Sequence, residues 1–393
     1  MYLAIAVLAL CTPAQFVDEP VHYGQIDLFD HGDFRLFKPF LTMLPGYHAL
    51  VSALLWAMDW RSLAGARFVS ALIGLCTIGA FYLARRRAWN SEDARAAATA
   101  TLQFGLLPIL LPYDFLVYTD VLSLGLVLAA SAATMSGRHL LSGVLMIASM
   151  CVRQTNVIWL PLLAGVAILP LWLEGKPTLR RQLGLAWPYF AGAALFVAYW
   201  LWNGSISLSR EQTAMHPDWS LHPGNIWFAL FLCSLLLPLH VFIGCREFAS
   251  RMVAKPWLAL VPLAAFATIW LTFRVDHPFN QLLEPLTLHN AVLLQCRDNA
   301  WCLVAYCLIA TAALCGLAAT PLQPRAARLL YPCALLALAG FWVVEQRYAL
   351  IPLALSLVFR ERMSARIEAA TTALWAIAAV CLCLGTFSGR FFP

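Results

Sequence analysis

Charged residues are scarce in this sequence. Asp, Glu, Lys and Arg together make up 12% of its 393 residues, about half of the roughly 25% found in an average soluble domain. So few charged groups cannot cover the surface of a soluble protein of this length, and the same composition excludes a disordered or collagen-like chain. The sequence also lacks a low-complexity tract, a polar linker and a convincing internal repeat.

The 12 cysteines lack the spacing of a metal or redox site. There is no Cys-x-x-Cys and no Cys/His arrangement, and most of the cysteines lie inside apolar runs, where cysteine acts as a small buried apolar residue. The net charge of +6 is modest and gives no indication of a nucleic-acid partner. We expect the positive excess to be distributed unequally between the two faces of a membrane.

Apolar residues make up 62% of the chain, and they occur in runs long enough to cross a bilayer, which takes about 17–25 residues. The predicted class is an all-α polytopic membrane protein with about 12–13 transmembrane helices in a single domain, residues 1–393. The long apolar runs lie near 66–84, 94–112, 184–202, 225–244, 256–273, 299–319, 328–345 and 368–387. The stretch 117–173 is read as three spans, Met1–Ala14 as a retained first span, and 347–360 as a further short candidate.

The distribution of Lys and Arg predicts the orientation. If Arg85, Arg86 and Arg87 are cytoplasmic and the spans alternate, one face receives loops 85–95, 137–139, 174–181, 245–255, 320–328 and 360–368. Those loops hold 16 Lys and Arg against 6 Asp and Glu, whereas the rest of the chain holds 10 and 14. This agrees with the positive-inside rule.

The apolar segment 41–60 does not fit as a span, because a crossing there would reverse every later loop. It contains Pro45, His48 and Asp59 and ends in Trp60-Arg61. We interpret it as an interfacial or re-entrant helix. The first outer loop then extends over residues 15–64 and is rich in acids.

The unusual polar residues gather at the outer ends of the predicted spans. Ionisable groups at membrane depth are costly and usually line a polar cavity. Here they come from many points of the chain and converge on one face, which indicates an anionic, lipid-borne substrate. These residues are Asp18-Glu19, Tyr118-Thr119-Asp120, Arg153-Gln154-Thr155-Asn156, Asn203-Gly204-Ser205, Asp276-His277-Pro278 and Glu345-Gln346-Arg347-Tyr348.

Each of these groups has a second interpretation. Asp18 and Glu19 suit a general base beside an orienting carboxylate, or they are solvated loop residues. Asp120 is a site residue or a helix N-cap. The guanidinium groups of Arg153 and Arg347 suit a phosphate, with an internal salt bridge to an acid such as Glu345 as the alternative. His277 is slightly favoured as an interfacial histidine with a backbone partner, and Asn203-Gly204-Ser205 as a structural turn rather than a glycosylated site.

At these residues the chain resembles a known family, the dolichyl-phosphate-glucose α-1,2-glucosyltransferases, which add the last glucose to a lipid-linked oligosaccharide. The resemblance is colinear over nearly the whole chain, and Arg153-Gln154-Thr155-Asn156 is its most specific block. The other matching blocks are Asp18-Glu19 with His22 and Gln25, Leu44-Pro45-Gly46, Tyr118-Thr119-Asp120, Trp202-Asn203-Gly204-Ser205-Ile206 and Arg347-Tyr348. Lys38, where the family usually has an acid, and Ser209-Arg210-Glu211 depart from the pattern.

The resemblance implies a GT-C-type fold and an inverting transfer of glucose, or a similar hexose, from a polyprenyl-phosphate donor to a lipid-linked glycan in α-1,2 linkage. It implies catalysis by Asp18 first and Glu19 second, and binding of the donor phosphate by Arg153 and Arg347. The implied substrate contacts are His22, Gln25, Tyr118, Asp120, Gln154, Asn156, His277 and Glu345.

We expect no cofactor, and a divalent metal held by the carboxylates is the less favoured alternative. The implied partners are the donor, the glycan acceptor and membrane lipid. The expected location is a bacterial inner membrane, or the ER membrane in a eukaryote, with the site on the periplasmic or lumenal face. The alternative function is a lipid-linked-sugar flippase or a solute transporter, although such transporters usually show internal repeats.

Overall fold

The computed structural model describes residues 1–37, 40–89, 93–173, 175, 178–212, 214–218, 220–284 and 286–393. Lys38 lies outside these ranges. The described residues form helices joined by loops, with two isolated bridges, Thr287 to Phe392 and Leu322 to Arg360, as the only β-type pairings among them. This confirms the predicted all-α class. One continuous cluster of buried apolar residues extends from Ile5 to Phe392.

The α-helices have the following bounds: α1 Tyr2–Cys11, α2 Glu19–Asp30, α3 Gly46–Met58, α4 Leu63–Ala88, α5 Ala94–Phe104, α6 Thr119–Met135, α7 His139–Val152, α8 Leu160–Leu173, α9 Leu179–Asn203, α10 Gly224–Leu236, α11 Pro238–Ala254, α12 Leu260–Thr272, α13 Leu288–Asp298, α14 Ala300–Ala319, α15 Leu330–Ala339, α16 Leu350–Phe359 and α17 Ala365–Phe387. Short 3₁₀ helices are η1 Leu111–Phe115, η2 Gln154–Trp159, η3 Arg210–Gln212, η4 Pro256–Ala259, η5 Pro278–Gln281, η6 Arg325–Leu329 and η7 Gln346–Ala349.

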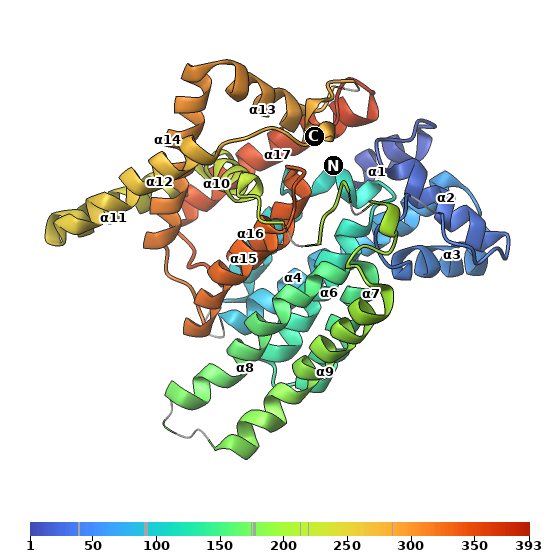
Figure 1. Cartoon of the computed structure of the whole chain (residues 1–393), viewed down its shortest axis with the longest axis horizontal. Helices are drawn as coiled ribbons and strands as arrows, with labels where there is room; N and C mark the ends of the chain where they lie inside the picture. Colours follow the sequence, from blue (N-terminus) through green and yellow to red (C-terminus); the bar gives the residue numbers. More distant parts are fainter. Residues whose placement is uncertain are drawn as a thin grey trace.

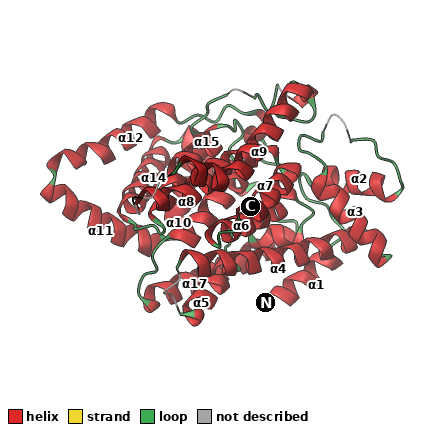
Figure 2. Cartoon of the chain, turned by 90° about the horizontal axis from the view of Figure 1, so that it is seen from below, coloured by secondary structure: helices red, strands yellow, loops and turns green. Residues whose placement is uncertain are grey.

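The helices of the middle of the sequence form an antiparallel group. Figure 1 shows α4, α6, α7, α8 and α9 lying side by side, and α11 and α12 extending away from them on the opposite side from α2 and α3. Figure 2 shows the same separation from below. The stretch 117–173, predicted as three spans, contains three helical segments: α6, α7 and the continuous segment η2 and α8. Of these, Gln154–Leu173 is long and apolar enough to cross a membrane, and α6 and α7 are shorter apolar helices.

Five helices in the described chain are long and apolar enough to cross a membrane: α4, Gln154–Leu173, α9, α14 and α17. The pair α10 and α11, bent by 105°, makes six if it counts as one span. The protein is therefore polytopic, but fewer helices meet this criterion than the 12–13 predicted. The run 94–112 is interrupted because α5 ends at Phe104, before Gly105, Pro108 and Pro112, and α15 covers only 10 residues of 328–345.

The segment 41–60 contains a helix that is too short to cross a bilayer. α3 has 13 residues, which gives a length of about 20 Å against roughly 30 Å of hydrocarbon. It buries Tyr47, Val51 and Leu55 against the protein and leaves an apolar face exposed that includes Leu54 and Trp56. This two-faced character agrees with an interfacial helix.

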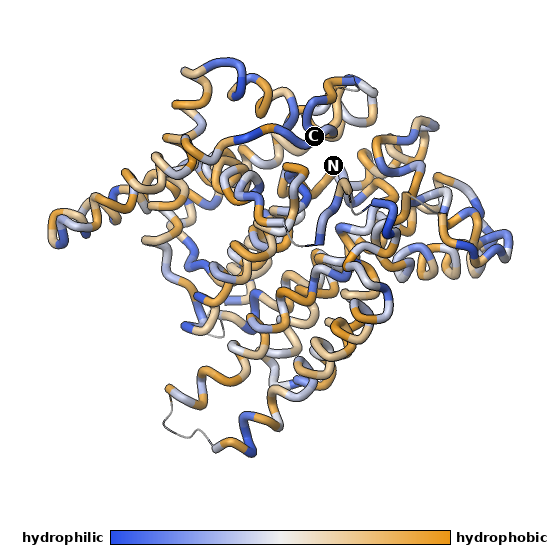
Figure 3. The backbone as a smooth tube through the Cα atoms, in the orientation of Figure 1, coloured by the Kyte–Doolittle hydropathy of each residue, from blue (hydrophilic) through white to orange (hydrophobic). Residues whose placement is uncertain are grey.

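Figure 3 shows the apolar residues along the helices and the polar stretches at helix ends and loops.

Several loops predicted on the cytoplasmic side meet one another. Arg85 donates to the carbonyl oxygens of Leu357, Val358 and Arg360, the last at 2.6 Å. Arg360 in turn holds both carboxylate oxygens of Glu368 at 2.8 Å. These contacts pin the ends of α4, α16 and α17 together, as the predicted topology requires.

The crossing of α11 and α14 requires two glycines. A Cβ atom at Gly244 would lie 2.7 Å from both the Cα and the carbonyl oxygen of Gly316. Such close backbone approach is typical of small residues in membrane helix pairs.

We therefore expect Gly244→Ala to destabilise the protein by about 1–3 kcal/mol, because the new methyl group meets backbone that cannot rotate away. The measurement is thermal unfolding of the purified protein in detergent. Gly79→Ala is the matched control, since nothing lies within 4 Å of a Cβ atom at that helical position. Equal stability of the two variants would contradict the close crossing.

Candidate functional site

The first outer loop is tied to the helices by a buried ion pair. Glu19 and Arg67 are 0% and 1% exposed, and Arg67 Nη2 and Nε contact the two carboxylate oxygens at 2.6 and 2.9 Å. The remaining guanidinium hydrogens go to the carbonyl oxygens of Ala9, Thr12 and Ala14. All five N–H donors of Arg67 are thus used.

Glu19 is also fully bonded. Its Oε1 accepts the backbone N–H of Val117 at 3.1 Å, and its Oε2 accepts that of Phe16 at 3.2 Å. A carboxylate with four hydrogen bonds and no exposure cannot approach a substrate, so its observed place is that of an anchor between the loop and α4.

Asp18, one residue earlier, has a different environment. Its backbone N–H donates to the Tyr118 hydroxyl at 2.9 Å, and that hydroxyl donates to the carbonyl oxygen of Phe16. The Asp18 side chain is 44% exposed and projects from the start of α2 toward Arg347, with Oδ2 at 2.8 Å from Nη2. Of the two adjacent acids, Asp18 therefore has an accessible carboxylate, and Glu19 has an inaccessible one.

Arg347, at η7, joins three carboxylates. Besides Asp18, its Nη2 contacts Glu345 Oε2 at 2.5 Å, and its Nη1 lies 3.9 Å from Asp120 Oδ2. The guanidinium lies over the ring of Tyr118, 5.3 Å from its centroid. Arg347 is nearly buried, at 9% exposure.

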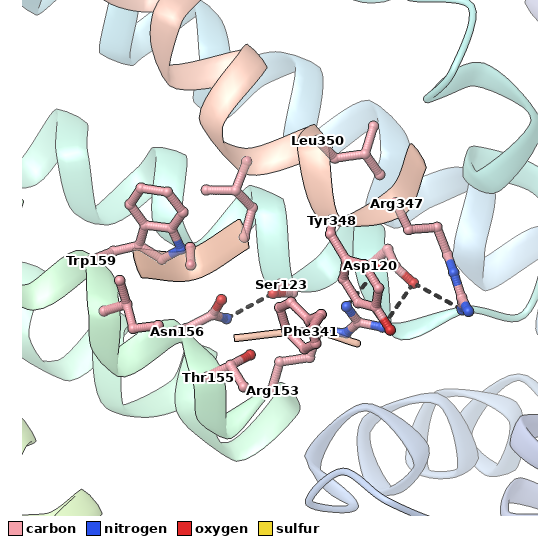
Figure 4. Close-up of a pocket in the computed structure, with 13 residues that line it drawn as sticks. Asp120, Ser123, Arg153, Thr155, Asn156, Trp159, Phe341, Arg347, Tyr348 and Leu350 are labelled. Atoms are coloured by element: carbon pink, nitrogen blue, oxygen red, sulfur yellow. Dashed lines mark hydrogen bonds and ion pairs between the residues drawn. The ribbon is translucent and has the colours of Figure 1, made fainter. Parts of the chain in front are cut away.

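Arg153 approaches Asp120 from the other side, as Figure 4 shows. Its Nη1 lies 3.1 Å from Asp120 Oδ1, and its Nε donates to the Thr119 hydroxyl at 3.1 Å. Asp120 lies in the first turn of α6, whose N-cap is Tyr118 without a side-chain cap. The N-cap interpretation of Asp120 is therefore wrong, because its carboxylate pairs with arginines instead.

Both arginines thus form internal salt bridges. This was the second interpretation of these residues, beside binding of a phosphate. Two guanidinium groups meet three carboxylates, so the cluster carries one net negative charge when all five groups are ionised. A phosphate that enters this cluster must take over arginine contacts that carboxylates hold.

Two cavities adjoin the cluster. The larger has a volume of about 700 Å³, and its lining includes Asp18, His22, Glu345 and Arg347. The smaller, of about 40 Å³, joins Asp120 and both arginines to an apolar wall that includes Trp159. Arg153 lines both cavities.

Aromatic side chains form the boundary between the two cavities. The rings of Phe341 and Tyr348 are stacked with centroids 3.9 Å apart, and both residues line each cavity. Next to them, Trp342 donates its indole N–H to Asp276 at 2.8 Å. Tyr348 was among the predicted outer residues, whereas Phe341 and Trp342 were not, since scattered Trp and Phe carry no signal in an apolar sequence.

The predicted site residues divide into two groups. The residues that line a cavity are Asp18, His22, Asp120, Arg153, Gln154, Asn156, Glu345 and Arg347. Glu19, Gln25, Tyr118 and His277 lie outside both linings. Gln25 bonds the backbone of Arg35 and Phe37, and His277 accepts from the N–H of Phe279, which supports the backbone-partner interpretation of His277.

The segment after α9 is built as a turn. The Asn203 amide donates to the carbonyl oxygens of Ser205 and Ser207 at 2.8 Å, and Gly204 has a φ of +72°. The structural-turn interpretation therefore agrees with the structure. Gln154 donates to the carbonyl oxygens of Thr42 and Ile206, so it fastens this turn and the first outer loop to η2.

No group of three or more His, Cys, Asp or Glu side chains in the described ranges is placed to hold a metal ion.

Near the cluster, burial and the nearby charges of Arg347 and Arg153 lower the pKa of His22 to about 3. His22 is therefore neutral at physiological pH.

The fold and the site define a polytopic membrane protein with a charged, cavity-lining site built from helix ends and the first outer loop. Residues 12–182 match the model of the DIE2/ALG10 family. This match confirms the family resemblance that the sequence motifs indicate.

Curated relatives extend the match. The chain is 26% identical over 378 residues to "Dol-P-Glc:Glc(2)Man(9)GlcNAc(2)-PP-Dol alpha-1,2-glucosyltransferase" of Drosophila melanogaster, covering 86% of this chain and 81% of that protein. The Arabidopsis thaliana protein of the same name is 30% identical over 180 residues, 42% of this chain and 35% of its own length. A Homo sapiens protein of that name is 29% identical over 256 residues, which cover 51% of this chain and 54% of that protein.

Two solved structures are similar in outline. ArnT from Cupriavidus metallidurans has a TM-score of 0.47 and 18% identity, covering 99% of this chain and 75% of ArnT. The archaeal oligosaccharyltransferase AglB from Archaeoglobus fulgidus has a TM-score of 0.42 and 14% identity, covering 100% of this chain and 56% of AglB.

The anchor formed by Glu19 and Arg67 is directly testable. We expect Glu19→Gln to lower the free energy of unfolding by about 3–5 kcal/mol, because it leaves a buried guanidinium without its counter-charge. Glu247→Gln is the matched control, since its pair with Arg251 is about half exposed and is worth less than about 1 kcal/mol. Thermal unfolding in detergent measures both. An anchor role is excluded if Glu19→Gln is as stable as the control.

Proposed function

We propose that the chain is an inverting glycosyltransferase. It moves glucose, or a similar hexose, from a polyprenyl-phosphate donor to a lipid-linked glycan and forms an α-1,2-type linkage. The names of its relatives support the donor and acceptor classes. The observation that carries the proposal is the half-exposed Asp18 carboxylate on the lining of a 700 Å³ cavity, 2.8 Å from a nearly buried arginine. A GT-C-type fold is part of this proposal.

The donor enters with its phosphate at Arg153 and Arg347 and its lipid on the apolar side. The small cavity supports this placement because it joins the two guanidinium groups to Ile158, Trp159 and Leu350. The cavity therefore has a cationic end and an apolar wall, which match the phosphate and the lipid chain of a polyprenyl phosphate. The planar arginine fork suits the phosphate oxygens.

In the reaction, the acceptor hydroxyl oxygen forms a bond to the anomeric carbon while the bond from that carbon to the phosphate oxygen breaks. Asp18 takes the hydroxyl proton, and the electron pair of the broken bond leaves on the phosphate. Attack opposite a β-linked phosphate gives an α product. The two arginines stabilise the charge that develops on the leaving phosphate. Glu19 acts as a positioning residue, because it anchors the helix start that presents Asp18.

The pairing of Asp18 with Arg347 sets the order of binding. While the pair is intact, the Asp18 carboxylate is occupied by the Arg347 guanidinium. A donor phosphate that takes over Arg347 releases the Asp18 carboxylate at the moment when a sugar is present to be transferred. Glu345 and Asp120 remain to hold the arginines in place.

The glycan acceptor occupies the larger cavity, which is lined by polar groups such as His216, Asp218 and Glu284 and by the aromatic ring of Trp342.

The proposal includes no cofactor. The carboxylates nearest the base are already paired with arginines, which favours charge stabilisation by guanidinium groups over the metal alternative. The relatives give no support to a flippase or transporter. In a bacterial inner membrane the site faces the periplasm, and in the ER membrane it faces the lumen.

We expect Asp18→Asn to lower glucose transfer by at least about 100-fold while donor binding persists, because the amide cannot accept the proton. The assay uses purified protein in detergent, radiolabelled polyprenyl-phosphate glucose and a lipid extract from the native host. Asp33→Asn is the control, since Asp33 lies in the same loop and pairs with exposed Arg35.

Near-normal transfer by folded Asp18→Asn would remove Asp18 from the mechanism. If the wild-type protein leaves the donor intact with every acceptor fraction, the glucosyltransferase proposal itself fails.

A further inference from the structure

One histidine of the larger cavity has no role in the reaction described above. His289 lies in the first turn of α13, is 7% exposed and lines the 700 Å³ cavity. Burial lowers the pKa of its imidazole, an effect that exceeds the opposite influence of Glu345 and of the main-chain oxygen of Pro393. The ring is therefore neutral at physiological pH, with a hydrogen on one nitrogen and a lone pair on the other.

The contacts of His289 decide which nitrogen carries the hydrogen. Its Nδ1 lies 3.0 Å from the main-chain oxygen of Pro393, and that oxygen also accepts from Gln346 Nε2 at 2.8 Å. A main-chain oxygen has no hydrogen to give, so Nδ1 is the donor in this contact. Nε2 of the neutral ring therefore carries the lone pair.

The oxygen that fixes this tautomer is itself held in place. The backbone of Phe392 makes two hydrogen bonds, of 2.8 and 2.9 Å, with the backbone of residues 286 and 288. Figure 1 shows this part of the chain beside α13. Through its bond to Gln346, the Pro393 oxygen also connects the imidazole to η7, the element that carries one arginine of the charged cluster.

The lone pair of Nε2 is open to the cavity. In the described ranges, the buried side-chain nitrogens without a hydrogen-bond partner include those of His22, His48 and His240, but not Nε2 of His289. Nε2 makes no hydrogen bond with the described residues either, because the one side-chain bond of His289 is made by Nδ1. Nε2 is therefore an unpaired atom with accessible surface, on a residue that lines the cavity.

The surroundings of Nε2 suit a sugar hydroxyl. Glu345 and Arg347 act electrostatically on His289, so the imidazole lies near the charged cluster, and the Phe392 ring lines the same cavity. A neutral lone pair accepts a hydrogen bond without adding the negative charge that would attract an amine or a metal ion. A pyranose offers hydroxyl donors beside an apolar ring face, and small-molecule sites combine apolar walls with a few polar groups that fix orientation.

We propose that His289 is a substrate-binding residue whose Nε2 accepts a hydrogen bond from one hydroxyl of the glycan acceptor. This rests on the proposed function for the identity of the acceptor, and it deepens that function by naming a residue that selects sugars with a hydroxyl at one position. Asp18 remains the base, and His289 takes no proton in this role.

The test is a binding cycle that pairs a change in the residue with a change in the ligand. The probes are methyl α-D-glucopyranoside and its monodeoxy analogues, titrated into wild-type protein in a detergent without a sugar head group. We expect one analogue to bind about tenfold more weakly than the parent glucoside, because its missing hydroxyl leaves Nε2 unpaired. In His289→Phe, which removes the lone pair, that analogue and the parent glucoside should bind equally.

His289→Gln is the matched control. Its Oε1 restores an acceptor near the position of Nε2, so this variant should still discriminate against the same analogue. An unchanged preference in His289→Phe overturns the proposal, because the hydroxyl would then be recognised elsewhere. Equal binding of all probes by the wild-type protein, or no binding of any of them, overturns it as well.

A measurement on the wild-type protein covers the case in which His289→Phe does not fold. The ¹⁵N chemical shifts of the His289 ring distinguish the tautomers, and we expect a protonated Nδ1 and a bare Nε2 whose resonance moves when the glucoside binds. The opposite tautomer, or an Nε2 resonance that bound glucoside leaves unmoved, overturns the proposal. Binding is independent of turnover, so protein that binds the glucoside through His289 but transfers no glucose would refute the transferase proposal and leave this sugar site standing.

Discussion

The arrangement of the site depends on one buried interaction, the pairing of Glu19 with Arg67. A guanidinium in the interior of a membrane protein is tolerated only when its charge and all its hydrogens are matched. Here the matching groups come from α1, from the residues directly after it and from Glu19 in the first outer loop. Arg67 on α4 is therefore fully bonded only when that loop is docked. The docked loop in turn places Asp18 against Arg347 and brings α2 and α3 together, which creates the contact between His22 and His48.

The separation of two adjacent acids follows from the same constraint. A helix starting at Glu19 turns successive side chains by about 100°, so Glu19 and Asp18 cannot face the same surroundings. Val17 immediately before them has a φ of +51°, a left-handed conformation that reverses the chain at this point. The result is one carboxylate that holds structure and another that remains accessible, although both have the same chemistry and neighbouring positions.

The sequence predicted the membrane class, the three helices in 117–173 and the gathering of Asp18, Asp120, Arg153, Glu345 and Arg347, because composition and the alternation of loops determine which ends of the spans share a face. It did not predict how these charges pair, since pairing depends on side-chain directions. Fewer described helices meet the length and hydropathy criterion than the spans predicted, and in the run 94–112 the reason is that hydropathy does not register the interruptions at Pro108 and Pro112. Arg67, a lone cation in an apolar run, was a signal that could have identified the anchor.

The contacts at the opposite end of the helices concern the order of biogenesis. Arg85, early in the sequence, is bonded to carbonyl oxygens at 357–360, and Gln103 accepts from Arg360. A ribosome must therefore synthesise more than 250 further residues before these groups find their partners. Until then these contacts between early and late helices cannot form, and the arginine cluster lacks Arg347. Membrane insertion of the first helices and assembly of a competent site are thus separate events.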